Sequence, residues 1–204
     1  MKKLIALFLL GVSALLTGCS DNIVPVEGKQ YSKLPANLST YRLPQVTEVF
    51  SLNCGHCGKM EAEIPKLESM IDQSIGKIHI TFNESAQIGA MIYYSAEMQL
   101  GHKPDHQMML ELFSAVQMAE GSTADRKGAI DRVFQSRDLI SPYDLGEDAQ
   151  TQLFQAMHLA DEITAKGEIS SVPTFIVNGK YLIITSGHEN LDSIADTIQY
   201  LIKQ

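Results

Sequence analysis

The stretch LNCGHCGKM, residues 52–60, contains two cysteines, Cys54 and Cys57, with only two residues between them. Such a pair can form half of a zinc site, brace the fold as a disulfide, or exchange electrons with other thiols. A disulfide across two residues closes so small a loop that it restrains the unfolded chain very little. A structural disulfide is therefore the weakest of the three interpretations, and the rest of the sequence must distinguish a zinc site from a redox pair.

The histidines and remaining cysteine do not favour a metal site. Structural zinc takes four ligands, and the whole chain has three cysteines. His102 and His106 are four residues apart, but Pro104 lies between them, so we expect both at the surface rather than on one helix face. We predict no metal and no bound cofactor, because the Cys54–Cys57 pair would itself be the redox-active group.

The sequence around the pair predicts a strand that runs directly into a helix. PQVTEVFSL, residues 44–52, is rich in β-branched and aromatic residues, as in a buried strand. Apolar residues then recur at helical spacing, at Met60, Ile64, Leu67 and Ile71. The unpaired amides and dipole of a first helical turn stabilise a thiolate at Cys54. We therefore expect Cys54 to be the exposed, reacting sulfur, aided by His56, and Cys57 to be the buried resolving sulfur.

The order of the other predicted elements indicates an α/β fold. GKIHITF, residues 76–82, reads as a second strand that alternates around Ile78, Ile80 and Phe82, and residues 85–168 read as helices. SVPTFIVNGKYLIIT, residues 171–185, reads as a hairpin around an Asn-Gly turn, and a helix ends the chain. A strand–helix–strand unit requires a parallel pair, so we predict a mixed sheet interrupted by an all-helical insertion.

The N-terminal residues 1–19 read as a secretory signal with a basic start, an apolar run and small residues at its end. LTGC resembles a bacterial lipobox, which implies that Cys19 is lipidated, and Ser20 after it favours the outer membrane. The alternative is an ordinary signal cut near Gly18, which leaves a soluble periplasmic protein with a free thiol. Residues 20–26 would be a tether from the membrane.

The charge of the chain excludes one class of partner. The formal net charge is −8, and nucleic-acid binding needs a basic surface that this composition does not supply. We expect no nucleic-acid partner.

Taken together, these features resemble the DsbA family of thiol:disulfide oxidoreductases, which have a thioredoxin fold with an inserted all-helical domain. PQVTEVFSLNCGHC matches the strand and active site of that family, and VPTFIVNGKY matches its second active-site loop and hairpin. The resemblance implies a thioredoxin-like domain of residues 27–84 and 169–204 and a helical domain of residues 85–168.

The resemblance also implies roles for residues outside the cysteine pair. Val172-Pro173 would be a cis bond beside the cysteines, with the backbone of Val172 free to pair with an extended substrate. Glu48 and Lys77 match an acid and a lysine that would move protons to and from the resolving cysteine.

Gly55 departs from the family pattern, because the best-known members have proline between the cysteines at this position. We expect Gly55 to border the substrate site and to loosen the turn. The resulting Gly-His dipeptide is that of protein disulfide isomerase, so we predict a strong but less extreme oxidant.

The predicted partners follow from the same resemblance. Reduced, unfolded exported proteins would be the substrates, a DsbB-like quinone-linked membrane protein would reoxidise the enzyme, and the chain would be a monomer. Two alternatives stay open: an envelope isomerase or reductase, and a non-catalytic lipoprotein that acts as a chaperone or metal carrier.

Overall fold

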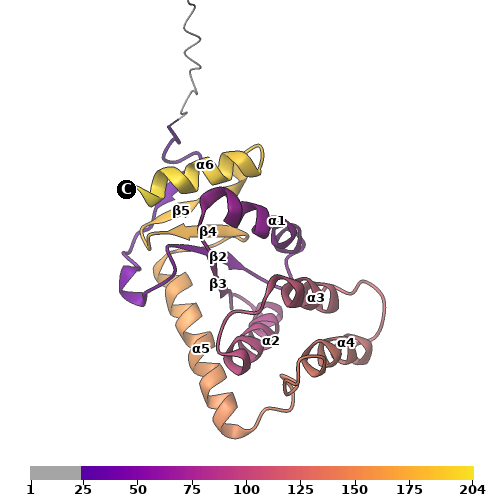
Figure 1. The fold of residues 1–204 in the computed structure, drawn as a ribbon. Coiled ribbons are helices and arrows are strands. Elements are labelled where there is room, and N and C mark those ends of the chain that lie inside the picture. Colours follow the sequence, from indigo (N-terminus) through magenta and orange to yellow (C-terminus); the bar gives the residue numbers. More distant parts are fainter. Residues whose placement is uncertain (1–23) are drawn as a thin grey trace, which may run out of the picture.

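The computed structural model of the protein describes residues 24–204. The predicted signal peptide with Cys19, and residues 20–23 of the predicted tether, lie outside the described residues. The described chain forms a five-stranded sheet in the order β1-β5-β4-β2-β3 (Figure 1). Its strands are β1 (Tyr31–Lys33), β2 (Val46–Phe50), β3 (Ile75–His79), β4 (Thr174–Val177) and β5 (Tyr181–Ile183). Only β2 and β3 are parallel, and the other pairs are antiparallel.

Most of the chain outside the sheet is helical. The α-helices are α1 (Gly55–Ile71), α2 (Glu84–Leu100), α3 (His106–Val116), α4 (Thr123–Gln135), α5 (Glu147–Lys166) and α6 (Leu191–Ile202). Two short 3-10 helices, η1 (Ser39–Tyr41) and η2 (Thr185–Gly187), complete the fold. The α/β class and the helical insertion between β3 and β4 are therefore confirmed, while the division into domains at residues 85 and 168 stays a prediction.

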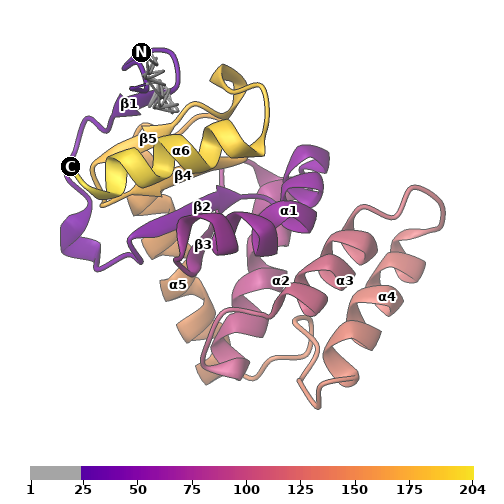
Figure 2. The same ribbon diagram turned by 45° about the horizontal axis from the view of Figure 1, so that its top comes forward.

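The helices cover both faces of the sheet, and each face has its own hydrophobic core (Figure 2). On one face α1 and α6 lie side by side, and Leu67, Phe175 and Ile198 are fully buried between them and the sheet. On the other face α2 and α5 pack against β3, and α3 and α4 extend this second core. Because β2 is covered on both faces, all five of its residues are buried.

The second strand is shorter than predicted. β3 ends at His79, and the Phe82 side chain is 43% exposed, so the prediction that Phe82 continues the buried alternation is wrong. The reason lies in its neighbour: β2 ends at Phe50 and turns toward α1. The last backbone contact along this edge is the hydrogen bond from Ile80 N–H to Phe50 O, at 3.0 Å.

The hairpin between β4 and β5 forms as the Asn-Gly pair predicts. Asn178 and Gly179 have φ values of 55° and 64°, which are left-handed conformations that favour asparagine and glycine. Residues 178–180 separate the paired Val177 and Tyr181, and Lys180 N–H donates to Val177 O at 3.0 Å. A Cβ atom at position 179 would lie 2.7 Å from the backbone nitrogen of Ser39, so only glycine fits there. No helix among residues 24–204 is long and apolar enough to cross a bilayer.

Candidate active site

Cys54 lies at the junction between β2 and α1, where it caps the helix. Its backbone is extended (φ −92°, ψ 113°), and its Sγ accepts a hydrogen bond from the Cys57 backbone N–H at 3.2 Å. Sulfur therefore takes the place of the oxygen that usually caps a helix, and it faces the positive end of the helix dipole. This geometry favours negative charge on the Cys54 sulfur.

Cys57 occupies a different environment one turn further along α1. Its side chain is fully buried, whereas Cys54 is partly exposed, and both are free thiols in the structure. Burial, together with the hydrogen bond to Cys54, raises the pKa of the Cys57 thiol. The two sulfurs therefore differ in access to solvent as the sequence predicts, because Cys57 lies on the buried face of α1.

The segment that leads to Cys54 is braced from two other elements. Gln117, which follows α3, donates from Nε2 to the carbonyl oxygens of Leu52 (2.8 Å) and Cys54 (3.0 Å). His79 at the end of β3 accepts from the Leu52 N–H through Nε2 at 2.8 Å, while its Nδ1 bonds to Ile80 O at 2.7 Å. These contacts hold the active-site loop before the helix begins.

The brace depends on a neutral imidazole at His79. Complete burial lowers the pKa of His79 to about 4, so Nε2 is free to accept at neutral pH. The ring has little room: a Cβ atom on Gly89 of α2 would lie 2.8 Å from His79 Nε2 and 2.6 Å from Asn53 Oδ1. Gly89 therefore permits α2 to approach the active-site loop closely.

A second loop reaches the cysteines from the far end of the sequence. The Val172-Pro173 peptide bond is cis, as predicted. The thiol of Cys54 donates to Val172 O, with an S···O distance of 3.7 Å, so the backbone of this loop lies directly against the exposed sulfur. Thr185 holds the loop from behind by donating to Pro173 O at 2.9 Å.

A groove of about 710 Å³ adjoins this loop. It runs between α1, the Val172-Pro173 loop and the start of α6. Its lining includes His56, Met60, Val172, Pro173, Leu191 and Ile194. The groove is mainly apolar and begins at His56, between the two cysteines. It can therefore take apolar side chains of a molecule that reacts at Cys54.

A cluster of charged side chains is buried beneath the cysteines. Lys77 on β3 forms ion pairs with Glu48 on β2 and Glu61 on α1, and the three side chains are 3%, 1% and 2% exposed. Burial raises the pKa of Glu48 despite the nearby lysine. Burial alone would lower the pKa of Lys77, but Glu48 and Glu61 together raise it. Glu48 Oε1 has no hydrogen-bond partner among the described residues.

His106 extends this cluster toward the surface. Its Nδ1 lies 3.0 Å from Glu61 Oε1, and its side chain is 38% exposed. His106 therefore lies at the surface as predicted, but it also contacts the buried cluster, because the N-terminus of α3 packs against α1. His102 is likewise exposed as predicted.

The structure brings the predicted site residues into one region and adds others to it. Cys54, Gly55, His56 and Cys57 form one end of α1, Val172 and Pro173 face them, and Glu48 and Lys77 lie below. The sequence reasoning missed Glu61, Gln117 and His79. Glu61 could have been found, because it interrupts the buried stripe of α1 that runs through Cys57, Ile64, Leu67 and Ile71.

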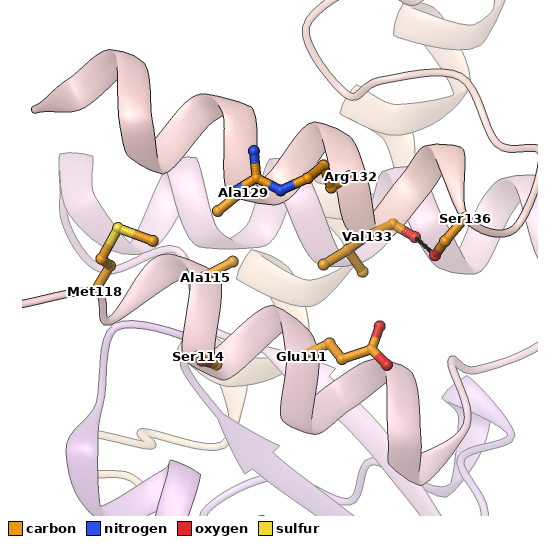
Figure 3. Close-up of a pocket in the computed structure, with 8 residues that line it drawn as sticks. All are labelled: Glu111, Ser114, Ala115, Met118, Ala129, Arg132, Val133 and Ser136. Atoms are coloured by element: carbon orange, nitrogen blue, oxygen red, sulfur yellow. Dashed lines mark hydrogen bonds between the residues drawn. The ribbon is translucent and has the colours of Figure 1, made fainter. Parts of the chain in front are cut away.

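Another groove, of about 320 Å³, lies between α3 and α4 (Figure 3). In the close-up Ala115 and Val133 face each other across it, and Glu111 and Arg132 lie on the two opposing helices. None of its lining residues comes from α1 or from the Val172-Pro173 loop. Within residues 24–204, no three histidine, cysteine or acidic side chains are arranged to hold a metal ion.

Comparison with known proteins identifies the class. The sequence profile described as thioredoxin matches residues 43–199. The thiol:disulfide interchange protein DsbA of Haemophilus influenzae is 26% identical, over 98% of this chain and 96% of the relative. The DsbA of Salmonella typhimurium is 28% identical, over 86% of this chain and 87% of the relative.

Solved structures agree in fold. Pseudomonas aeruginosa DsbA superposes with a TM-score of 0.65 at 20% identity, over 88% of this chain and 93% of that one. A Proteus mirabilis DsbA with a non-covalently bound peptide superposes with a TM-score of 0.62 at 18% identity, over 88% and 99% of the two chains. The chain belongs to the thioredoxin family, and the relatives that it matches over most of their length are thiol:disulfide interchange proteins of the DsbA type. It is a thiol:disulfide oxidoreductase.

Proposed function

We propose that this enzyme oxidises reduced, unfolded proteins exported to the bacterial periplasm, with Cys54 as the sulfur that clients attack. The observation that carries the proposal is the asymmetry of the pair: Cys54 caps the helix and contacts Val172, which lines a groove, whereas Cys57 is fully buried. An attacking thiolate can reach only one of these two sulfurs.

The proposed reaction has two exchange steps. A client thiolate attacks Sγ of Cys54 in the Cys54–Cys57 disulfide, a client–Cys54 bond forms, and the broken bond leaves its electron pair on Cys57. A second thiolate of the client then attacks the client sulfur of this mixed disulfide, and Cys54 departs as a thiolate. The client loses two electrons and gains a disulfide, while the enzyme gains both electrons.

Substrate binding would use the loop and groove beside the pair. The backbone of Val172 lies against Cys54 Sγ, so an extended client can pair with this loop while an apolar side chain enters the groove. Gly55 leaves the approach open, since a Cβ at that position would meet no atom within 4 Å. A structure of Proteus mirabilis DsbA holds a non-covalently bound peptide, which supports a peptide as the kind of ligand for this fold.

Glu48 and Lys77 would serve the buried sulfur. The thiolate left on Cys57 in the first step lies in surroundings that disfavour charge, because burial raises the pKa of this thiol. Glu48 has a raised pKa and an oxygen with no partner in the described structure, so it can carry the proton that Cys57 needs. Lys77 would compensate the carboxylate that remains. His56, exposed at the groove, would favour the thiolate on Cys54.

The N-terminus would place the enzyme at a membrane. Lipidation of Cys19 and a short tether would hold it at the envelope surface, where a DsbB-like quinone-linked membrane protein can reoxidise it. Replacing Cys19 with serine should move the protein from the membrane fraction to the soluble periplasmic fraction. An unchanged distribution would remove the lipid anchor from this proposal.

The oxidase proposal is tested by two measurements on the purified enzyme. The oxidised form should convert a reduced, unfolded two-cysteine protein to its disulfide form with loss of one enzyme disulfide per client disulfide. The reduction potential should lie between the reference values of about −120 mV for DsbA and about −180 mV for protein disulfide isomerase. A potential near that of thioredoxin, about −270 mV, would instead indicate a reductase.

A further inference from the structure

His106 connects the buried charge cluster to solvent. Its side chain is 38% exposed, and its Nδ1 lies 3.0 Å from Oε1 of a carboxylate, Glu61, that is only 2% exposed. The other oxygen of Glu61 binds Lys77, which also binds Glu48. A continuous series of polar contacts therefore runs from the surface to the acid beneath the cysteine pair.

The cluster has two carboxylates for a single buried lysine, Lys77. Lys103, from the segment between α2 and α3, also acts electrostatically on the cluster, but its Nζ is bound to Glu68 at 3.1 Å. Asp105, next to His106 in the chain, uses its side chain to cap α3. His106 is therefore the group placed to supply a second positive charge, and it can do so only when it is protonated.

We propose that His106 is a positioning residue for disulfide exchange, which couples the external pH to the oxidising strength of the cysteine pair through Glu61. The proposal rests on the redox role assigned above to Cys54 and Cys57. His106 touches neither sulfur, so it would act through the charge cluster alone.

The direction of the effect follows from where charge appears in the reaction. A protonated His106 compensates Glu61 and leaves more of the Lys77 charge to act on Glu48 and the cysteines. Positive charge stabilises the thiolate of the reduced enzyme, whereas the disulfide form has no thiolate to stabilise. Because a histidine carries charge only when it is protonated, His106 should make the enzyme a stronger oxidant at lower pH.

The test compares the full-length wild type with His106→Gln and His106→Arg. Glutamine can donate a hydrogen bond to Glu61 without charge, and arginine keeps its charge throughout. The equilibrium constant for oxidation of glutathione by each enzyme is measured at about pH 5 and about pH 8. Each constant is divided by that of His106→Gln at the same pH, so the titration of glutathione cancels.

We expect the equilibrium constant of His106→Arg to exceed that of His106→Gln about threefold at both pH values, because solvent partly screens the charge of a half-buried side chain. The wild type should follow His106→Arg at the lower pH and His106→Gln at the higher. His102→Gln is the matched control, since His102 is exposed and its Nδ1 meets only the Lys103 carbonyl, at 2.8 Å; it should follow the wild type throughout.

Two results would overturn the inference. The first is a ratio of wild type to His106→Gln that is the same at both pH values, which is what a packing role alone would produce. The second is a constant for His106→Arg equal to that of His106→Gln. A wild type that does not equilibrate with glutathione would overturn the redox role itself, and the inference with it.

Discussion

Replacing Cys57 with alanine is expected to make the enzyme accumulate mixed disulfides with its clients at Cys54. The partly exposed Cys54 thiolate can still attack a disulfide of an oxidised client or of the reoxidant, and one sulfur of that disulfide leaves as a thiolate. The buried thiol that would release the bound protein is missing, so the mixed disulfide persists. Steady-state oxidation should fall by at least about 10³-fold, as for other enzymes that lose one member of a reacting pair. Mass spectrometry of the trapped adducts would identify clients and reoxidant together.

The reciprocal substitution gives the control for this experiment. Cys54→Ala leaves only the buried thiol of the pair, so it should lose activity to the same extent but trap almost nothing. Equal amounts of adduct on the two variants would contradict the assigned roles, because burial would then not decide which sulfur reacts. Activity that survives loss of both cysteines would instead favour the alternative of a non-catalytic chaperone.

Replacing Lys77 with methionine is expected to lower the free energy of unfolding by about 3–5 kcal/mol, because it leaves two buried carboxylates without their cation. For a chain of this length the melting temperature should fall by roughly 10 °C. Calorimetry or thermal unfolding followed by circular dichroism measures the change. The corresponding surface substitution, Lys33→Met, removes an ion pair of two exposed side chains and should have little effect.

The loss of unfolding free energy in Lys77→Met should change with pH in a predictable direction. Burial raises the pKa of Glu48 above its ordinary value in the folded state. Above the ordinary value of about 4.3, the folded protein therefore keeps a proton that the unfolded chain has lost, and stability decreases as the pH rises toward the folded-state pKa. Without Lys77 the folded-state pKa of Glu48 should rise further. The loss of unfolding free energy caused by Lys77→Met should therefore be smaller at about pH 5 than at about pH 8.

Neutralising the whole cluster separates charge from packing. A variant with Glu48→Gln, Glu61→Gln and Lys77→Met has no unpaired buried charge and should regain most of the lost stability. It should nevertheless exchange disulfides more slowly than the wild type, because Glu48 can no longer carry a proton to the buried sulfur. A triple variant as unstable as Lys77→Met would show that shape, rather than charge, accounts for the loss.

Much of the fold was accessible from the sequence because it depends on local patterns. Alternating and β-branched residues mark β2, the Asn-Gly pair marks the hairpin, and apolar residues at helical spacing mark α1 and α6. The same local rules placed Cys54 at a helix start and Cys57 one turn inside it. They failed at Phe82, since the end of β3 is decided by where its neighbour β2 turns away.

By itself, the sequence therefore determined where the cysteine pair lies, its unequal burial and the α/β framework, because each depends on residues within a few turns of one another. Only the tertiary structure decided what surrounds that pair. Glu61 meets His106 across 45 positions of the chain, and Gln117 reaches the Leu52 carbonyl across 65. Both contacts exist because α3 packs against α1, and no local pattern records which buried helix faces will meet.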